Sequence, residues 1–123
     1  MSGEESRMLG RWGETLVAEK LRREGCTLLA AGWRCRMGEI DLIAVDGTYL
    51  RFVEVKLRRN DRFSKAMEAV DRRKREKLRI TAQLYLAEHS TELQPRFDVA
   101  EVYVPEGIRT QSPKINYIED AFQ

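Results

Sequence analysis

The chain has 123 residues, of which 42% are hydrophobic and 34% are charged, and its net charge is +2. A chain of this length can bury a hydrophobic core without disulfides or structural metals, so we expect one domain over residues 1–123. The sequence has no run of about 20 apolar residues, which excludes a membrane-spanning helix.

Cysteine and histidine are too few for most metal or nucleophile sites. The two cysteines, Cys26 and Cys35, and the single histidine, His89, do not have the spacing of a zinc site. We expect His89 to lie on the surface, late in a helix. Two cysteines without a disulfide framework favour a reducing compartment, and residues 1–14 have no apolar signal core, so we expect a cytoplasmic protein.

Positive charge is concentrated in the middle of the chain. The segment from Arg51 to Arg79 contains twelve Lys/Arg and five Asp/Glu, while the rest of the chain has more acidic than basic residues. Such a segment suggests a polyanionic partner such as a nucleic acid. The alternative is a solvated helix surface held by ion pairs.

The N-terminal third predicts a helix followed by a strand. Apolar side chains recur at helical spacing between Leu9 and Leu21, which predicts a helix over residues 6–24. Gly25 has the position of a helix C-cap. Residues 28–36 are rich in apolar and aromatic side chains and predict a strand.

A hairpin follows, with strands expected over residues 40–45 and 49–56. The dipeptide Asp46-Gly47 between them is a strong signal for a tight hairpin turn. If these two residues form the turn, numbers of opposed residues sum to 93. The opposed pairs would then be Val45–Thr48, Asp41–Phe52 and Glu39–Glu54.

The second half of the chain predicts a basic loop over residues 58–65 and the longest helix over residues 67–88. Residues 96–104 alternate like a half-buried strand, and residues 114–118 suggest a short last strand. The expected fold class is therefore α/β, a central mixed sheet flanked by helices in the order α-β-β-β-α-β.

The hairpin separates charged from apolar side chains. Residues two apart on a strand share a face, and so do opposed residues, so Glu39, Asp41, Glu54 and Lys56 all project from one face. With this register, Asp41 and Glu54 are diagonal neighbours about 7–8 Å apart at Cα. The opposite face receives only apolar side chains: Ile40, Leu42, Ala44, Val53 and Val55.

The charged face suggests a metal site. Neighbouring carboxylates on a sheet repel one another unless a cation lies between them. Mg²⁺ suits this position because it takes one or two carboxylates and keeps waters and phosphate oxygens as further ligands. Lys56 beside Asp41 and Glu54 could hold an attacking water or neutralise charge on a phosphate. The alternative is a solvent-facing strand with an ordinary Glu54–Lys56 pattern.

Two further acids are candidates for the same site. Glu14 borders the apolar face of the first helix, and Gly13 would let that helix approach the sheet closely. Glu14 either points at the carboxylates or is an ordinary glutamate at the helix edge. The sequence does not choose between Glu14 and Glu39 as the third acid.

Basic residues near the hairpin could bind phosphates of the nucleic-acid backbone without sequence specificity. Lys74 falls on the inner stripe of the long helix, where it either extends to solvent or reaches the charged face. The expected nucleic-acid-binding residues are Arg58, Arg59, Arg62, Lys65 and Lys74.

The pattern of Asp41, then Glu54-Val55-Lys56 on a hairpin, after a helix with Glu14, resembles the PD-(D/E)xK nuclease motif. The amino-acid sequences of several blocks are similar to those of the YraN family of small bacterial proteins. Those blocks are Gly13-Glu14, Gly38–Ala44 (GEIDLIA), Phe52–Lys56 (FVEVK), Ala69-Val70 with Lys74, Arg96–Val99 (RFDV) and Ala121-Phe122.

The resemblance implies a restriction endonuclease-like fold, related to Holliday junction resolvases, and a Mg²⁺- or Mn²⁺-dependent endonuclease. It implies Asp41 and Glu54 as metal ligands, helped by Glu14, and Lys56 as the catalytic lysine; Glu39 has no agreed role in the general motif. Resolvases usually act as symmetric dimers, so the resemblance also suggests a homodimer.

Our first hypothesis is a nuclease that cuts DNA, including branched or otherwise structured DNA. The second is a non-catalytic nucleic-acid-binding module of the same fold. A third is a protein–protein adaptor in DNA repair or uptake. The carboxylates favour the first, because a protein that only binds DNA gains nothing from groups that repel phosphate.

Overall fold

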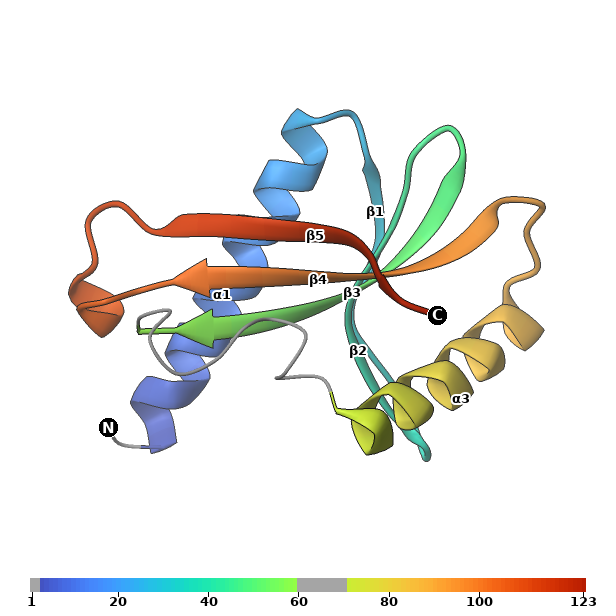
Figure 1. The fold of residues 1–123 in the computed structure, drawn as a ribbon, viewed down its shortest axis with the longest axis horizontal. Coiled ribbons are helices and arrows are strands. Elements are labelled where there is room, and N and C mark those ends of the chain that lie inside the picture. The colour runs from blue at the N-terminus through green and yellow to red at the C-terminus, as the bar shows by residue number, and fades with distance from the viewer. Residues whose placement is uncertain (1–2, 60–70) are drawn as a thin grey trace.

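The structure, a computed structural model, describes residues 3–59 and 71–123. In that part of the chain a helix and three strands precede a second helix and two strands, with a short 3₁₀ turn between the last two (Figure 1). The order agrees with the prediction, and the last strand is present. The elements are α1 (Gly3–Arg23), β1 (Thr27–Cys35), β2 (Gly38–Val45), β3 (Tyr49–Arg58), α3 (Arg72–Glu88), β4 (Gln94–Tyr103), η1 (Gly107–Arg109) and β5 (Lys114–Phe122).

The five strands form one open mixed sheet in the order β1-β2-β3-β4-β5. Only β3 and β4 are parallel in this sheet, and the chain between them passes through α3, as a parallel pair requires. Helix α1 covers one face and α3 the other. The predicted α/β class is therefore confirmed. Neither helix described here is long and apolar enough to cross a membrane.

The helix ends follow local capping chemistry. Gly25 adopts φ +95°, and the next N–H, from Cys26, donates to Leu21 O at 2.9 Å, which confirms the predicted C-cap of α1. At the start of α3, the carboxylate of Asp71 accepts the N–H of Lys74 at 2.9 Å and caps the helix. The first residues of the expected helix over 67–88 lie outside the described part of the chain.

Each face of the sheet has its own hydrophobic core. The core under α1 buries Leu9, Val17 and Leu21 of the helix against Leu42 and Val53. The core under α3 contains other residues of the same strands together with the inner side of that helix. Its buried members are Ile40, Ile43, Leu50, Phe52, Leu78, Ala82, Tyr85, Val99, Ala121 and Phe122.

The predicted register of the hairpin is wrong by two residues. Val45 pairs with Leu50, and Leu42 pairs with Val53. The N–H of Asp46 donates to the carbonyl of Tyr49, so the two residues of the turn itself are Gly47 and Thr48. The reason is the side chain of Asp46, which accepts the N–H groups of Thr48 and Tyr49, both at 2.7 Å. A residue that closes a turn in this way stands before its central residues rather than among them.

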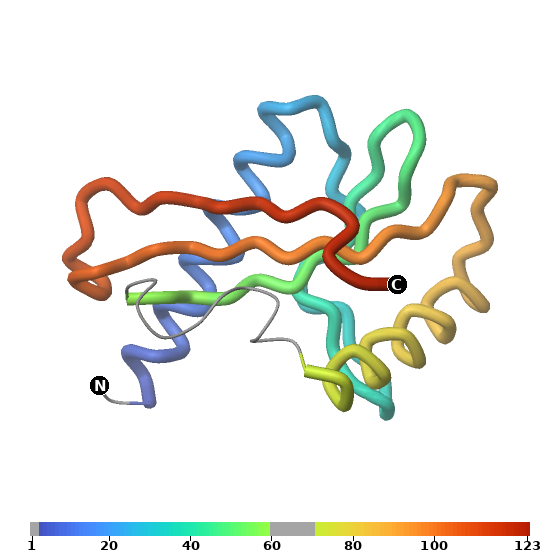
Figure 2. Tube along the Cα trace, in the orientation of Figure 1, coloured from blue at the N-terminus to red at the C-terminus, as the bar shows by residue number. Residues whose placement is uncertain are grey.

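The assignment of faces survives this correction, because a shift of two residues preserves the alternation of a strand. Ile40 is the exception, since it packs in the core under α3 instead of the core under α1. The cause is a fork in the sheet beyond the Leu42–Val53 pair. From there β2 pairs only with β1, and β3 only with β4. Figure 2 shows β3 turning away from the β1–β2 pair.

A buried charge network fastens the last strand. Asp98 is fully buried and takes two hydrogen bonds from Arg96, at 2.8 and 3.0 Å. The hydroxyl of Tyr117 donates to the same carboxylate at 2.5 Å, and the N–H of Asp120 at 2.9 Å. Because every one of these donors comes from β4 or β5, the network fixes β5 against the sheet.

Helix α1 approaches the sheet most closely at Gly13, where an added Cβ would lie 2.8 Å from Leu57 Cδ2. We therefore expect Gly13→Val to lower the free energy of unfolding by about 1–3 kcal/mol through overpacking. The matched control is Gly10→Ala in the same helix, where an added Cβ meets no atom within 4 Å. That change should raise the stability by about 0.5–1 kcal/mol. Urea unfolding curves measure both, and a neutral Gly13→Val would contradict the close approach.

Candidate functional site

The fork between β2 and β3 brings two carboxylates together. Instead of a backbone carbonyl of β2, the Oδ2 atom of Asp41 accepts the N–H of Val55, at 2.8 Å. The carboxyl group of Glu54 shares a hydrogen bond with Asp41 and is 7% exposed. Two acids from neighbouring strands therefore meet at the point where the sheet divides.

Burial of Glu54 raises its pKa, and the hydrogen bond and the charge of Asp41 raise it further, to about 8. Lys74 and Lys56 act in the opposite direction. A protonated Glu54 can donate to Asp41, so the two carboxyl groups can lie this close together.

The pair lines a cavity of about 160 Å³ between the sheet and α3. Lys74 reaches into it, with Nζ 3.8 Å from Glu54 Oε2, so this side chain takes the second of the two orientations that the sequence left open. Lys56 follows Glu54 by two residues on β3 and therefore lies on the same face. The cavity is lined by Gly38, Glu39, Asp41, Glu54, Lys74, Lys77, Leu78 and Thr81.

The two candidates for a third acid lie in different places. Glu39 lines the same cavity and accepts a hydrogen bond from Arg34 at 3.0 Å. Glu14 lines a separate hollow between α1 and the sheet. Burial raises the pKa of Glu14 to about 7, with contributions from the charges of Asp41 and Glu39, so Glu14 lies within electrostatic reach of these two acids.

The donor atoms at the fork fit a hard divalent cation. The Oε2 atom of Glu54 is buried and accepts no hydrogen bond, although buried polar atoms rarely lack a partner. Within residues 3–59 and 71–123, no group of three His, Cys, Asp or Glu side chains could hold a metal ion. A cation here would therefore be held by Asp41 and Glu54 alone among the acids, a set that Mg²⁺ accepts when waters complete its shell.

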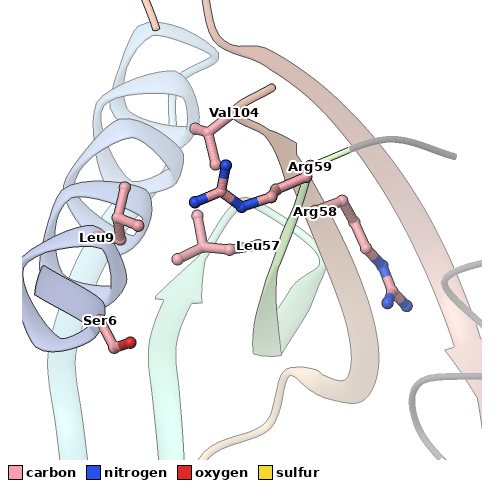
Figure 3. Close-up of a pocket in the computed structure, with 6 residues that line it drawn as sticks. All are labelled: Ser6, Leu9, Leu57, Arg58, Arg59 and Val104. Carbon is pink, nitrogen blue, oxygen red and sulfur yellow. The ribbon is translucent and has the colours of Figure 1, made fainter. Parts of the chain in front are cut away.

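The expected nucleic-acid-binding residues that the structure describes, Arg58, Arg59 and Lys74, do not all lie on one side of the sheet. Arg58 is the last residue of β3, so the expected loop begins one residue later than predicted; residues 60–65 lie outside the described part of the chain. The side chain of Arg58 points away from that of Arg59 (Figure 3). Arg59 lies over an apolar hollow of about 310 Å³ beside Leu9 and Val104, on the side of α1. Arg62 and Lys65 lie outside the described residues.

Sequence reasoning missed two side chains that line the cavity, Lys77 and Thr81. Both had a signal, because they follow Lys74 by three and seven residues and so share its helical face. It also missed Glu101, a buried acid of β4 beside Lys56. The sequence did indicate it, because Glu101 is an acidic residue at an inward-facing position of the alternating pattern over residues 96–104.

Comparisons with known proteins agree on one family. The family model described as "Uncharacterised protein family UPF0102" matches residues 13–102. A protein named UPF0102 protein from Pseudomonas aeruginosa is 39% identical over 121 residues, which are 97% of this chain and 95% of the relative. UPF0102 proteins from Nocardia farcinica and Caldanaerobacter subterraneus are 44% and 40% identical; each covers 93% of this chain, and the matches span 88% and 93% of those relatives.

The raised pKa of Glu54 predicts how stability depends on pH. The folded protein keeps a proton up to about pH 8 that the unfolded chain releases near 4.5. The free energy of unfolding should therefore fall as the pH rises from about 5 to about 8, by at most about 1.4 kcal/mol per pH unit for this proton. Thermal melts with a chelator present measure the slope.

Glu54→Gln should remove the larger part of this slope, because the amide does not titrate. Glu88→Gln, which changes an exposed glutamate at the end of α3, should keep the wild-type slope. Stability that stays level or rises between pH 5 and pH 8 in the wild-type protein would contradict the assignment.

Proposed function

The chain belongs to the UPF0102 family, and from the site that it builds we propose that it is a metal-dependent nuclease of the PD-(D/E)xK type that hydrolyses phosphodiester bonds of DNA. The observation that carries this proposal is the buried pair of Asp41 and Glu54, with an acceptor oxygen that no hydrogen bond fills. Lys56 and Lys74 supply positive charge beside the pair. Carboxylates and lysines at one cavity suit a cation that binds a phosphate.

Asp41 and Glu54 would hold Mg²⁺ or Mn²⁺, which would supply a Lewis acid for the phosphate and a more acidic bound water. Asp41 uses Oδ2 for the N–H of Val55, which fixes the orientation of its other oxygen. Lys56 would orient the attacking water or stabilise charge on the phosphate. Lys74 would move from Glu54 to a phosphate oxygen once the cation balances the carboxylates.

The finer parts of the proposal rest on the resemblance of the motif. They are a restriction endonuclease-like fold, membership of the YraN group, a branched or structured DNA substrate and action as a homodimer. The alternative function is a nucleic-acid-binding module without catalysis. Lys74 and Lys77 on one face of α3 would serve that function as well, so cleavage has to be measured separately from binding.

A cleavage assay tests the proposal. Purified protein should cut supercoiled, linear, single-stranded or four-way-junction DNA only when Mg²⁺ or Mn²⁺ is present. Asp41→Asn and Lys56→Met should each lower the rate by about a hundredfold or more. The amide oxygen of Asp41→Asn can still accept the N–H of Val55, so we expect this variant to fold.

Lys114→Met is the matched control, because Lys114 is an exposed lysine at the start of β5. It should cut like the wild type. Binding without metal-dependent cutting on all four substrates would overturn the catalytic part of the proposal and favour the alternative. Cutting that survives both site variants would identify a contaminant.

Metal binding can be tested without DNA. A cation that binds only the folded protein raises its stability, by about 2.7 kcal/mol at a hundred times its dissociation constant. We expect Mn²⁺ to raise the melting temperature of the wild type at pH 7.5, and we expect no increase for Asp41→Asn or Glu54→Gln. Glu119→Gln, an exposed acid of β5, should respond like the wild type. An unchanged response in both site variants would show that any bound Mn²⁺ lies elsewhere.

A further inference from the structure

A second buried carboxylate lies on the same face as the candidate site. Glu101 of β4 is the register partner of Lys56 on β3, and paired residues share a face of the sheet. Glu101 as a whole is only 2% exposed. A charge at this depth is costly unless specific partners compensate it.

The partners of Glu101 come from the strands on either side. Its Oε1 atom accepts a hydrogen bond from the side-chain amide of Asn116 on β5, at 2.9 Å. Its Oε2 atom lies 3.6 Å from Nε of Arg58 on β3 and accepts no hydrogen bond. One oxygen of Glu101 is therefore held by a hydrogen bond from β5, and the other faces the guanidinium group of Arg58 on β3.

The ion pair with Glu101 gives Arg58 a partner inside the sheet. The side chain of Arg58 is 18% exposed, and that of Glu101 is 3% exposed, so the pair is held within the sheet surface rather than in solvent. The side chain of Arg59, the next residue, points into the hollow beside α1 instead (Figure 3). Strand geometry places Arg58 about 13 Å along β3 from Glu54, a span of a few nucleotides.

We propose that Glu101 and Asn116 are positioning residues that hold Arg58 to bind a backbone phosphate of the nucleic acid, a few nucleotides from the one at the carboxylate pair. The inference rests on the proposed function only in taking a nucleic acid as the partner. Arginine presents a planar fork of donors that suits a phosphate, provided that its direction is fixed. Glu101 supplies that direction, and Asn116 keeps Glu101 in place.

DNA binding without divalent metal tests the inference, with fluorescence anisotropy on a labelled duplex at several salt concentrations. Arg58→Ala should reduce the slope of log K against log salt by about 0.9, the value of one lost phosphate contact. Glu101→Gln should weaken binding about three- to tenfold and reduce the slope, because Arg58 loses its fixed direction. Simple electrostatics makes the opposite prediction, since this change removes a negative charge near DNA.

Two further variants keep the test decisive. Asn116→Ala changes an exposed residue, so the protein should fold, and its binding should weaken in the same direction as in Glu101→Gln. Glu106→Gln removes an exposed acid just beyond β4, and its binding should equal or exceed that of the wild type. Circular dichroism melts verify that each variant is folded.

The inference is overturned if folded Glu101→Gln binds as tightly as the wild type or more tightly. If Glu101→Gln does not fold, undiminished binding by Asn116→Ala overturns it instead. A wild-type protein that binds no DNA would remove both this inference and the proposed function. A protein that binds DNA as described but cuts none would leave this inference standing and remove only the catalytic proposal.

Discussion

The hydrogen bond from the N–H of Val55 to Oδ2 of Asp41 is the contact on which the rest of the site depends. In a regular hairpin that N–H would pair with a backbone carbonyl of the neighbouring strand. Here the carboxylate of Asp41 accepts that N–H instead, so β2 can separate from β3 without leaving a buried N–H group unpaired. The space that opens at this point is the cavity lined by Asp41 and Glu54.

Charge at the fork is balanced in more than one way. The raised pKa of Glu54 leaves a proton between the carboxyl groups, and Lys74 provides a counter-charge 3.8 Å from Glu54 Oε2. A divalent cation would do the same work more completely, because it would also fill the free lone pairs of Glu54 Oε2. At this point β2, which carries Asp41, pairs with β1, and β3, which carries Glu54, pairs with β4. Both strands also pack against the hydrophobic cores, so the backbone at the two acids has little freedom to relax.

The polar groups on this face form a row along β3 rather than one cluster. Glu54 and Lys56 lie at the fork, and Arg58 lies beyond them with Glu101 behind it. Parallel pairing with β4 places Glu101 beside Lys56, although the two residues are 45 positions apart in the chain. Lys56 and Arg58 are therefore two successive basic side chains on this face, each with an acid beside it.

The sequence by itself determined the order of the elements, the α/β class and the face on which Asp41, Glu54 and Lys56 lie. Those features depend on local periodicity, and alternation along a strand is unchanged by the two-residue error in the register. Only the structure decided between two local turns at Asp46, and it shows that the side chain of Asp46 closes the turn. Only the tertiary structure decided that β2 and β3 part at Asp41 and that Glu101 lies beside Arg58. These last two contacts join separate strands, so their geometry depends on how the whole sheet twists and packs.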